Sequence, residues 1–186
     1  MEKARTYNIL SSPAEIKVLT EKALNHLPPL GFDVKIKFQR IGQGEFENTK
    51  IGAVAQGPSH TLVVNTDWYE TTSEQDIKYI IWHEMRHMYQ WSQIEKLHNS
   101  QHFEETTNII SQWQNELVNY IKNTPETEER HMKQEMEIDA YAFALYMLFR
   151  YCADSNGTVN IGLPPVIEDE LMNRVRKKII LESSPI

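Results

Sequence analysis

The alternation of hydrophobic and polar residues predicts a small sheet in the first third of the chain. Over residues 32–39, hydrophobic positions alternate with charged or polar ones, which is the period-two pattern of a half-buried strand. Residues 49–55 and 60–65 favour two further strands, and the Gly-Pro pair at 57–58 predicts a turn between them. We therefore expect three strands within the first 65 residues.

Helical periodicity dominates the rest of the chain. Hydrophobic residues recur at steps of three or four, which predicts amphipathic helices over residues 13–27, 73–99, 104–122 and 165–181. A further segment, residues 135–149, is hydrophobic on nearly all sides, as is typical of a buried central helix. We expect an α+β fold in which a small mixed sheet of about three strands precedes a mainly helical C-terminal half.

The segment 73–99 contains the most informative chemistry. Ser73 followed by Asp76 resembles a capping box at the start of a helix. His83 and His87 lie one turn apart and point the same way, so their ring nitrogens could share a zinc ion at about 2.0–2.1 Å. Glu84 could then act as general base toward an attacking water. The histidines border the hydrophobic face of this helix, where a polar group needs a partner.

A third ligand must come from another part of the chain. Gln90 and Gln93 occupy the positions that hold Gly and His in the extended metzincin pattern, so that pattern is absent. A glutamate from a second helix would complete two histidines and leave a fourth position open. Glu135 and Glu137 are the candidates, and they point to nearly opposite sides of their helix, so only one can be the ligand.

The two segments together resemble the gluzincin metallopeptidases. The resemblance rests on His-Glu-x-x-His at 83–87 and on Glu-x-x-Ala-x-x-Phe-Ala at 137–144. The best matches are small intracellular members, which include the catalytic cores of the membrane-bound CAAX prenyl proteases and compact zinc peptidase domains that act on phage-type repressors. The resemblance implies the small soluble intracellular kind. The resemblance implies a zincin-like fold, Zn²⁺ as cofactor, a peptide or protein substrate, and Glu137 as third ligand. Tyr141 departs from the family, which usually has Asp or Asn there.

The resemblance also assigns a place to the last predicted strand. It implies that residues 60–65 form a sheet edge beside the zinc, which pairs with an extended substrate. The oxyanion of the reaction needs a neutral donor beside the metal, and His131, Tyr141 and Tyr146 are candidates.

Residues 97–131 form a helical insertion between the two ligand-bearing helices, since Glu137 follows His87 by 50 positions. The insertion either forms a lid or wall over the site or only packs against the core. Arg86 could pair with Asp139 or Glu135 and so brace the two helices.

Composition narrows the classes of partner and compartment. A length of 186 residues favours a single domain over residues 1–186. The net charge of −7 argues against nucleic acid as a partner. Cys152 stands alone, which favours a reducing compartment such as the cytoplasm. Residues 1–6 lack the hydrophobic region of a secretory signal, and no apolar run is long enough to span a membrane. No feature identifies an oligomeric state.

These features predict a zinc-dependent peptidase. In it, His83, His87 and Glu137 hold Zn²⁺, and Glu84 takes a proton from the attacking water. An alternative is a non-catalytic, zinc-stabilised protein-binding module, which keeps the three ligands but does not need Glu84. A zinc-free structural domain, in which the histidines bond to backbone or carboxylate groups, is the remaining alternative.

Overall fold

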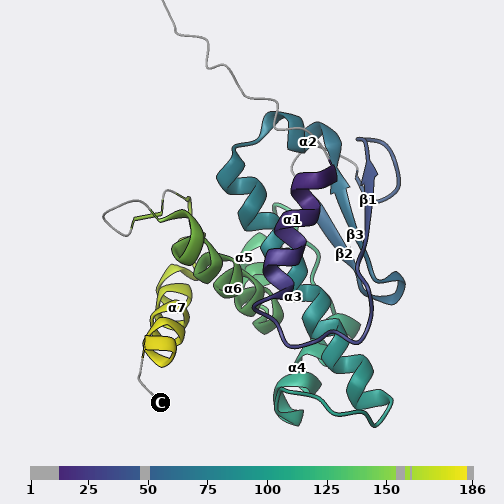
Figure 1. Cartoon of the computed structure of the whole chain (residues 1–186), viewed down its shortest axis with the longest axis vertical. Coiled ribbons are helices and arrows are strands. Elements are labelled where there is room, and N and C mark those ends of the chain that lie inside the picture. Colours follow the sequence, from purple (N-terminus) through teal and green to yellow (C-terminus); the bar gives the residue numbers. More distant parts are fainter. Residues whose placement is uncertain (1–12, 47–50, 154–157, 160, 184–186) are drawn as a thin grey trace, which may run out of the picture.

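The computed structural model describes residues 13–46, 51–153, 158–159 and 161–183 of the chain (Figure 1). The described elements are, in order, α1 (Pro13–Leu24), β1 (Lys35–Gln39), β2 (Ala53–Gln56), the 3₁₀ turn η1 (Gly57–Ser59), β3 (Thr61–Asn65), α2 (Thr66–Thr71), α3 (Glu74–His98), α4 (Thr107–Val118), α5 (Glu128–Met132), α6 (Glu135–Cys152) and α7 (Glu168–Ser183). The predicted α+β class is confirmed. Residues 49 and 50 of the second predicted strand lie outside the described residues.

The sheet has the strand order β1-β3-β2. Strand β3 pairs in parallel with β1 and antiparallel with β2, so the sheet is mixed, as expected. Our expectation that residues 60–65 form an edge strand is wrong, because β3 is central and β2 is the edge that packs on α3. The physical reason is burial: all five residues of β3 are buried, as is typical of a strand covered on both faces, whereas β1 alternates.

Helix α3 begins as the sequence predicts. The Ser73 hydroxyl accepts a hydrogen bond from the Asp76 backbone N–H at 3.1 Å, which satisfies one of the free donors at the helix N-terminus. The helix is tied to α1 by the Trp82 indole, which donates to the Leu19 carbonyl at 3.1 Å. Trp82 is fully buried, and most of the residues of α3 that face the sheet or α6 are buried with it. Helix α3 is therefore the central support of the fold.

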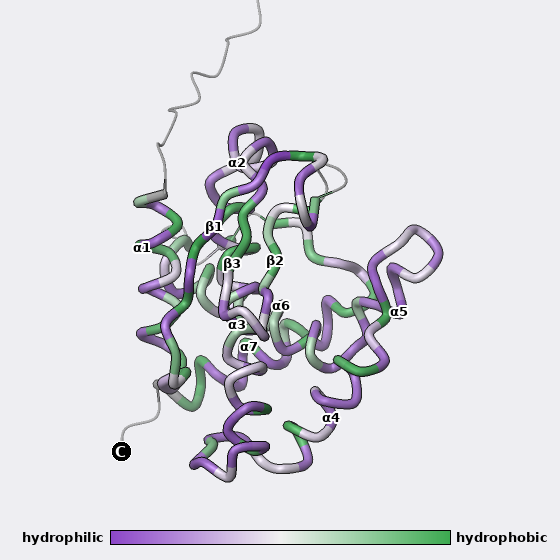
Figure 2. The backbone as a smooth tube through the Cα atoms, turned by 90° about the vertical axis from the view of Figure 1, so that its right-hand side faces the viewer, coloured by the Kyte–Doolittle hydropathy of each residue, from purple (hydrophilic) through white to green (hydrophobic). Residues whose placement is uncertain are grey.

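The helical second half is arranged around α6. In Figure 1 the sheet lies on one side of α3, and α6 and α7 lie on the other. Helix α6 packs against α3, and α7 packs against α6. Colouring by hydropathy shows that the chain around α5 is mostly hydrophilic, in contrast to the middle of the central strand β3 (Figure 2). None of the helices in the described part of the chain combines the length and apolar content needed to cross a bilayer.

Two short helices, α2 and α5, were not predicted, because a single turn or two shows no clear periodicity. The predicted helix over 104–122 is shorter than expected and ends at Val118. After it, the Ile121 N–H donates to the Gln134 side chain at 3.0 Å, and the Ile121 carbonyl accepts from His131 at 2.9 Å. These tertiary contacts hold the backbone of Ile121, so its groups are satisfied without continuing the helix.

Candidate metal centre

The two histidines of α3 face the same space. His83 and His87 lie one turn apart, and their Nε2 atoms are 2.9 Å from each other. Both rings are largely withdrawn from solvent, with side-chain exposures of 6% for His83 and 14% for His87. The helical spacing thus brings two ring nitrogens together inside the protein, as the sequence predicts.

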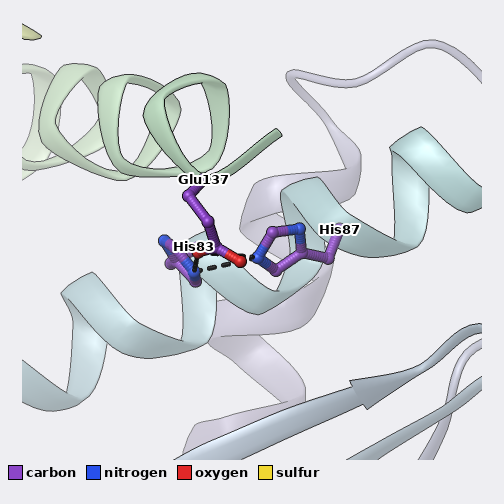
Figure 3. Close-up of side chains that lie close together, drawn as sticks. All are labelled: His83, His87 and Glu137. Atoms are coloured by element: carbon purple, nitrogen blue, oxygen red, sulfur yellow. Dashed lines mark hydrogen bonds and ion pairs between the residues drawn. The ribbon is translucent and has the colours of Figure 1, made fainter. Parts of the chain in front are cut away.

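Glu137 reaches the same space from α6 (Figure 3). Its Oε2 lies 3.3 Å from His83 Nε2 and 3.5 Å from His87 Nε2, and the side chain is only 2% exposed. Burial opposes ionisation of this carboxyl, but the two histidines outweigh that effect and hold its pKa well below the usual value. Glu137 is therefore a buried carboxylate between two imidazoles.

The start of α6 is fixed by a side chain from the insertion. The Glu116 carboxylate on α4 accepts the backbone N–H groups of Glu135 at 2.9 Å and of Met136 at 2.8 Å. A negative charge at this end also suits the helix dipole. The insertion thereby sets where α6 begins, and with it the position of Glu137 two residues after Glu135.

The geometry of these three residues fits a metal ion. Ligands about 2.0–2.1 Å from a tetrahedral zinc ion lie about 3.3 Å apart. The ligand atoms of His83, His87 and Glu137 all lie within 4.8 Å of one another, with the separations given above. Two imidazole nitrogens and a carboxylate are a donor set that zinc accepts with one position left open. Among the described residues, buried His83 Nδ1 has no hydrogen-bond partner, which leaves Nε2 as the atom that the site engages.

Glu135, the rival ligand, lies on the other side of α6. Its two carboxylate oxygens accept from Arg174 of α7 at 2.6 and 2.9 Å. Because residues two apart on a helix point in nearly opposite directions, Glu135 cannot share the space of Glu137. The structure therefore brings Glu137, and not Glu135, together with the histidines.

Glu84 lies beside the group rather than within it. Its Oε2 accepts a hydrogen bond of 2.7 Å from the backbone N–H of Ala55 on the edge strand β2. Burial raises the pKa of Glu84, and Glu137 raises it further, while His83 and His87 oppose this shift. A buried carboxyl with a raised pKa has the property required of a general base.

The three candidate oxyanion donors occupy different surroundings. His131 is buried, and its Nε2 lies 3.7 Å from Glu137 Oε2. The Tyr141 ring packs beside His83, with the ring centroids 4.3 Å apart. Tyr146 instead packs against His26, which lies just after α1, with the ring centroids 6.1 Å apart. Of the three, His131 and Tyr141 lie at the site.

Tyr120 is a residue of the site that the sequence did not reveal. Its hydroxyl donates a hydrogen bond of 2.8 Å to Glu137 Oε1. Burial of the hydroxyl and the adjacent carboxylate raise the pKa of Tyr120 above its usual value, so it stays a neutral donor. Tyr120 follows the end of α4 in a segment without regular structure, so no spacing pattern connects it to the histidines.

The insertion forms a wall of the site as well as packing on the core. Ile110 and Trp113 of α4 are buried, whereas Tyr120 and His131 contact Glu137. The insertion also lines a cleft of about 790 Å³, to which Asn119 and Arg130 contribute. His83, His87 and Glu137 do not line this cleft, so the cleft and the candidate metal centre are separate features of the described residues.

Comparison of the chain with protein-family models, curated proteins and solved structures gave no match. The resemblance to the gluzincins therefore depends on the residues of the two ligand-bearing helices, and membership of that family stays a prediction.

Proposed function

We propose that this chain is a zinc-dependent peptidase that hydrolyses peptide bonds of a peptide or protein substrate. The observation that carries the proposal is the convergence of His83, His87 and Glu137 beside the buried carboxyl of Glu84. The three ligands would hold Zn²⁺, and the ion would supply a Lewis acid that polarises a carbonyl and acidifies water. The zincin-like fold and a cytoplasmic setting belong to the same proposal.

Glu84 performs the proton transfer in this mechanism. The Ala55 N–H holds Oε2 of Glu84, which leaves Oε1 to take the proton of a water in the site. The raised pKa of Glu84 makes it a stronger base than an exposed glutamate. The same carboxyl then gives the proton to the leaving amine, which restores the starting state.

The surroundings of Glu84 support a peptide as substrate. Because Asn65 N–H bonds to the Gly52 carbonyl, the alternating pattern of the antiparallel pair turns the peptide groups of Ala55 away from β3. An extended peptide alongside β2 would meet this edge next to the general base. The Tyr120 hydroxyl, a neutral donor in contact with Glu137, would stabilise an oxyanion.

The test is the variant Glu84→Gln in the zinc-loaded protein. It keeps the shape of the side chain and the three ligands but removes the base, so we expect cleavage to fall about 10²- to 10⁴-fold. Cleavage would be measured on a proteome-derived peptide mixture, and zinc content by atomic emission. Zinc content should stay at the wild-type value, which separates loss of the base from loss of the metal. Equal cleavage by wild type and variant would refute the proposal.

A second function is favoured by one observation, the near-complete burial of the ligands, with Glu137 and His83 only 2% and 6% exposed. Closed centres are typical of structural zinc, and a zinc-stabilised module that binds a protein partner would need no general base. Under this alternative, chelation lowers the melting temperature, because zinc binds only the folded state. Glu84→Gln would then change neither the zinc content nor the binding of the partner.

A further inference from the structure

A buried glutamine connects the candidate metal centre to a charged pair between α3 and α6. Gln90 is fully buried and lies one turn after His87, whose Nδ1 is 2.8 Å from Gln90 Oε1. The amide nitrogen of Gln90 donates to the Met136 carbonyl at 2.9 Å and to Asp139 Oδ2 at 2.7 Å. All hydrogen-bonding atoms of this amide are thus engaged inside the protein.

The partners of Gln90 determine which way its amide faces. A backbone carbonyl accepts hydrogen bonds and never donates them. Asp139 is also held as an acceptor, because the Arg86 guanidinium binds it through two N–H groups, at 2.8 Å from Nε and 3.0 Å from Nη2. A flipped amide would place its oxygen against two acceptors in a dry environment, which is costly. Gln90 Oε1 therefore faces His87.

The orientation of the amide in turn determines the tautomer of His87. An amide oxygen only accepts, so the proton of the His87 ring must lie on Nδ1. Nε2, the atom that faces His83 and Glu137, is then the nitrogen that is free to bind a metal.

We propose that Gln90 is a positioning residue that sets the metal-binding tautomer of His87, and that Asp139 and Arg86 hold Gln90 in the orientation required. This inference rests on the proposed zinc centre. It also accounts for Tyr141, which stands where the resembling family has Asp or Asn. In this chain the acceptor for His87 is Gln90, on the same helix, and the Asp139 carboxylate acts on His87 through the Gln90 amide. Partners of this kind contribute about 10- to 100-fold to metal affinity.

The first test compares Gln90→Leu with the matched control Gln93→Leu. Gln93 is also fully buried on α3, but its Oε1 accepts from the Glu104 backbone N–H at 2.7 Å, away from the ligands. Zinc affinity would be measured by competition with a chromogenic chelator, and stability by melting of the chelated proteins. We expect Gln90→Leu to bind zinc about 10- to 100-fold more weakly than Gln93→Leu. Equal affinities of the two variants would overturn the inference.

A second variant tests the orientation itself and decides the matter if Gln90→Leu does not fold. In Asp139→Asn the new amide can donate to Gln90, so only the Met136 carbonyl still opposes a turn of the Gln90 amide. A turned amide would force the proton of His87 onto Nε2. We expect weaker zinc binding and a changed ¹⁵N chemical shift of His87 in the zinc-free protein at high pH. An unchanged shift together with unchanged affinity would contradict the inference.

These outcomes are distinct from failure of the proposed function. A wild-type protein that binds no zinc would overturn the zinc centre, and the inference with it. A wild-type protein that binds zinc as tightly as Gln90→Leu would overturn only the role of Gln90.

Discussion

The two histidines of the candidate centre are one turn apart on α3, yet the protein holds their rings in different ways. His87 is held by hydrogen bonds, since its Nδ1 meets Gln90 and, through it, Asp139. His83 Nδ1 is buried without such a partner among the described residues, and the ring instead packs on Tyr141. Polar contacts orient one of these histidines, and shape orients the other.

This difference follows from the order of residues on α6. Tyr141 lies one turn after Glu137 and so on the same side of the helix, where it contacts His83. Asp139 lies between them in sequence and reaches α3 at Gln90 and Arg86 instead. One short stretch of α6 therefore supplies three groups. Glu137 lies between the two histidines, Tyr141 contacts His83, and Asp139 holds the glutamine that contacts His87. His83 and His87 thus lie one turn apart on the same helix and still have different surroundings.

The largest expected effect comes from removing the group that both histidines share. Glu137→Gln replaces the buried carboxylate by a neutral amide, so we expect zinc affinity to fall by more than about a hundredfold, beyond the range for outer partners. The matched control is Glu135→Gln, which loses a partly exposed ion pair with Arg174 and should keep zinc affinity within about fivefold. Chelator competition measures both variants, and similar losses in the two would contradict the assignment of the third ligand.

The convergence of His83 and His87 could be predicted from the sequence because helical periodicity places them on one side of α3. The choice between Glu135 and Glu137 needed the resemblance, since both are compatible with a buried helix. Tyr120 and the role of Gln90 could not be predicted, because each depends on a contact between segments far apart in the chain. Sequence spacing along one element says nothing about such contacts.

The error about the sheet has a different origin. The edge position of residues 60–65 came from the resemblance, while the residues themselves indicate the opposite. Leu62, Val63 and Val64 are consecutive hydrophobic residues, and each is fully buried. A continuous hydrophobic run is typical of a strand that is covered on both faces, so the local pattern was the better guide.

A pH titration would sharpen the comparison on the His87 side. Burial alone would lower the pKa of His87, but the Glu137 carboxylate outweighs it and raises the pKa to about 9. Zinc must therefore displace a proton from the metal-free protein at neutral pH. We expect the apparent zinc affinity to rise by nearly tenfold per pH unit from about pH 7, and to level off near pH 9. An affinity that does not change over this range would contradict the proton displacement.

The same shift predicts the opposite trend for the stability of the metal-free fold. Because the folded-state pKa lies above the unfolded value of 6.5, the stabilisation is complete below about pH 6.5 and is lost as the pH rises toward 9. The melting temperature of the chelated protein should therefore fall over this interval. In the control variant His87→Leu, which lacks the titrating ring, the fall should be smaller.

The smallest expected effect concerns Tyr141 on the His83 side. If this side is held by shape, the ring is needed and the hydroxyl is not, since that hydroxyl makes no hydrogen bond within the described part of the chain. Tyr141→Phe should thus keep zinc affinity within about twofold, whereas Tyr141→Ala removes the ring contact and should cost about 1 kcal/mol of binding. Chelator competition on the two variants tests this. If cleavage falls in Tyr141→Phe while zinc affinity holds, the hydroxyl is the oxyanion donor. If Tyr141→Phe instead loses as much zinc affinity as Tyr141→Ala, His83 is oriented by a polar contact, as His87 is.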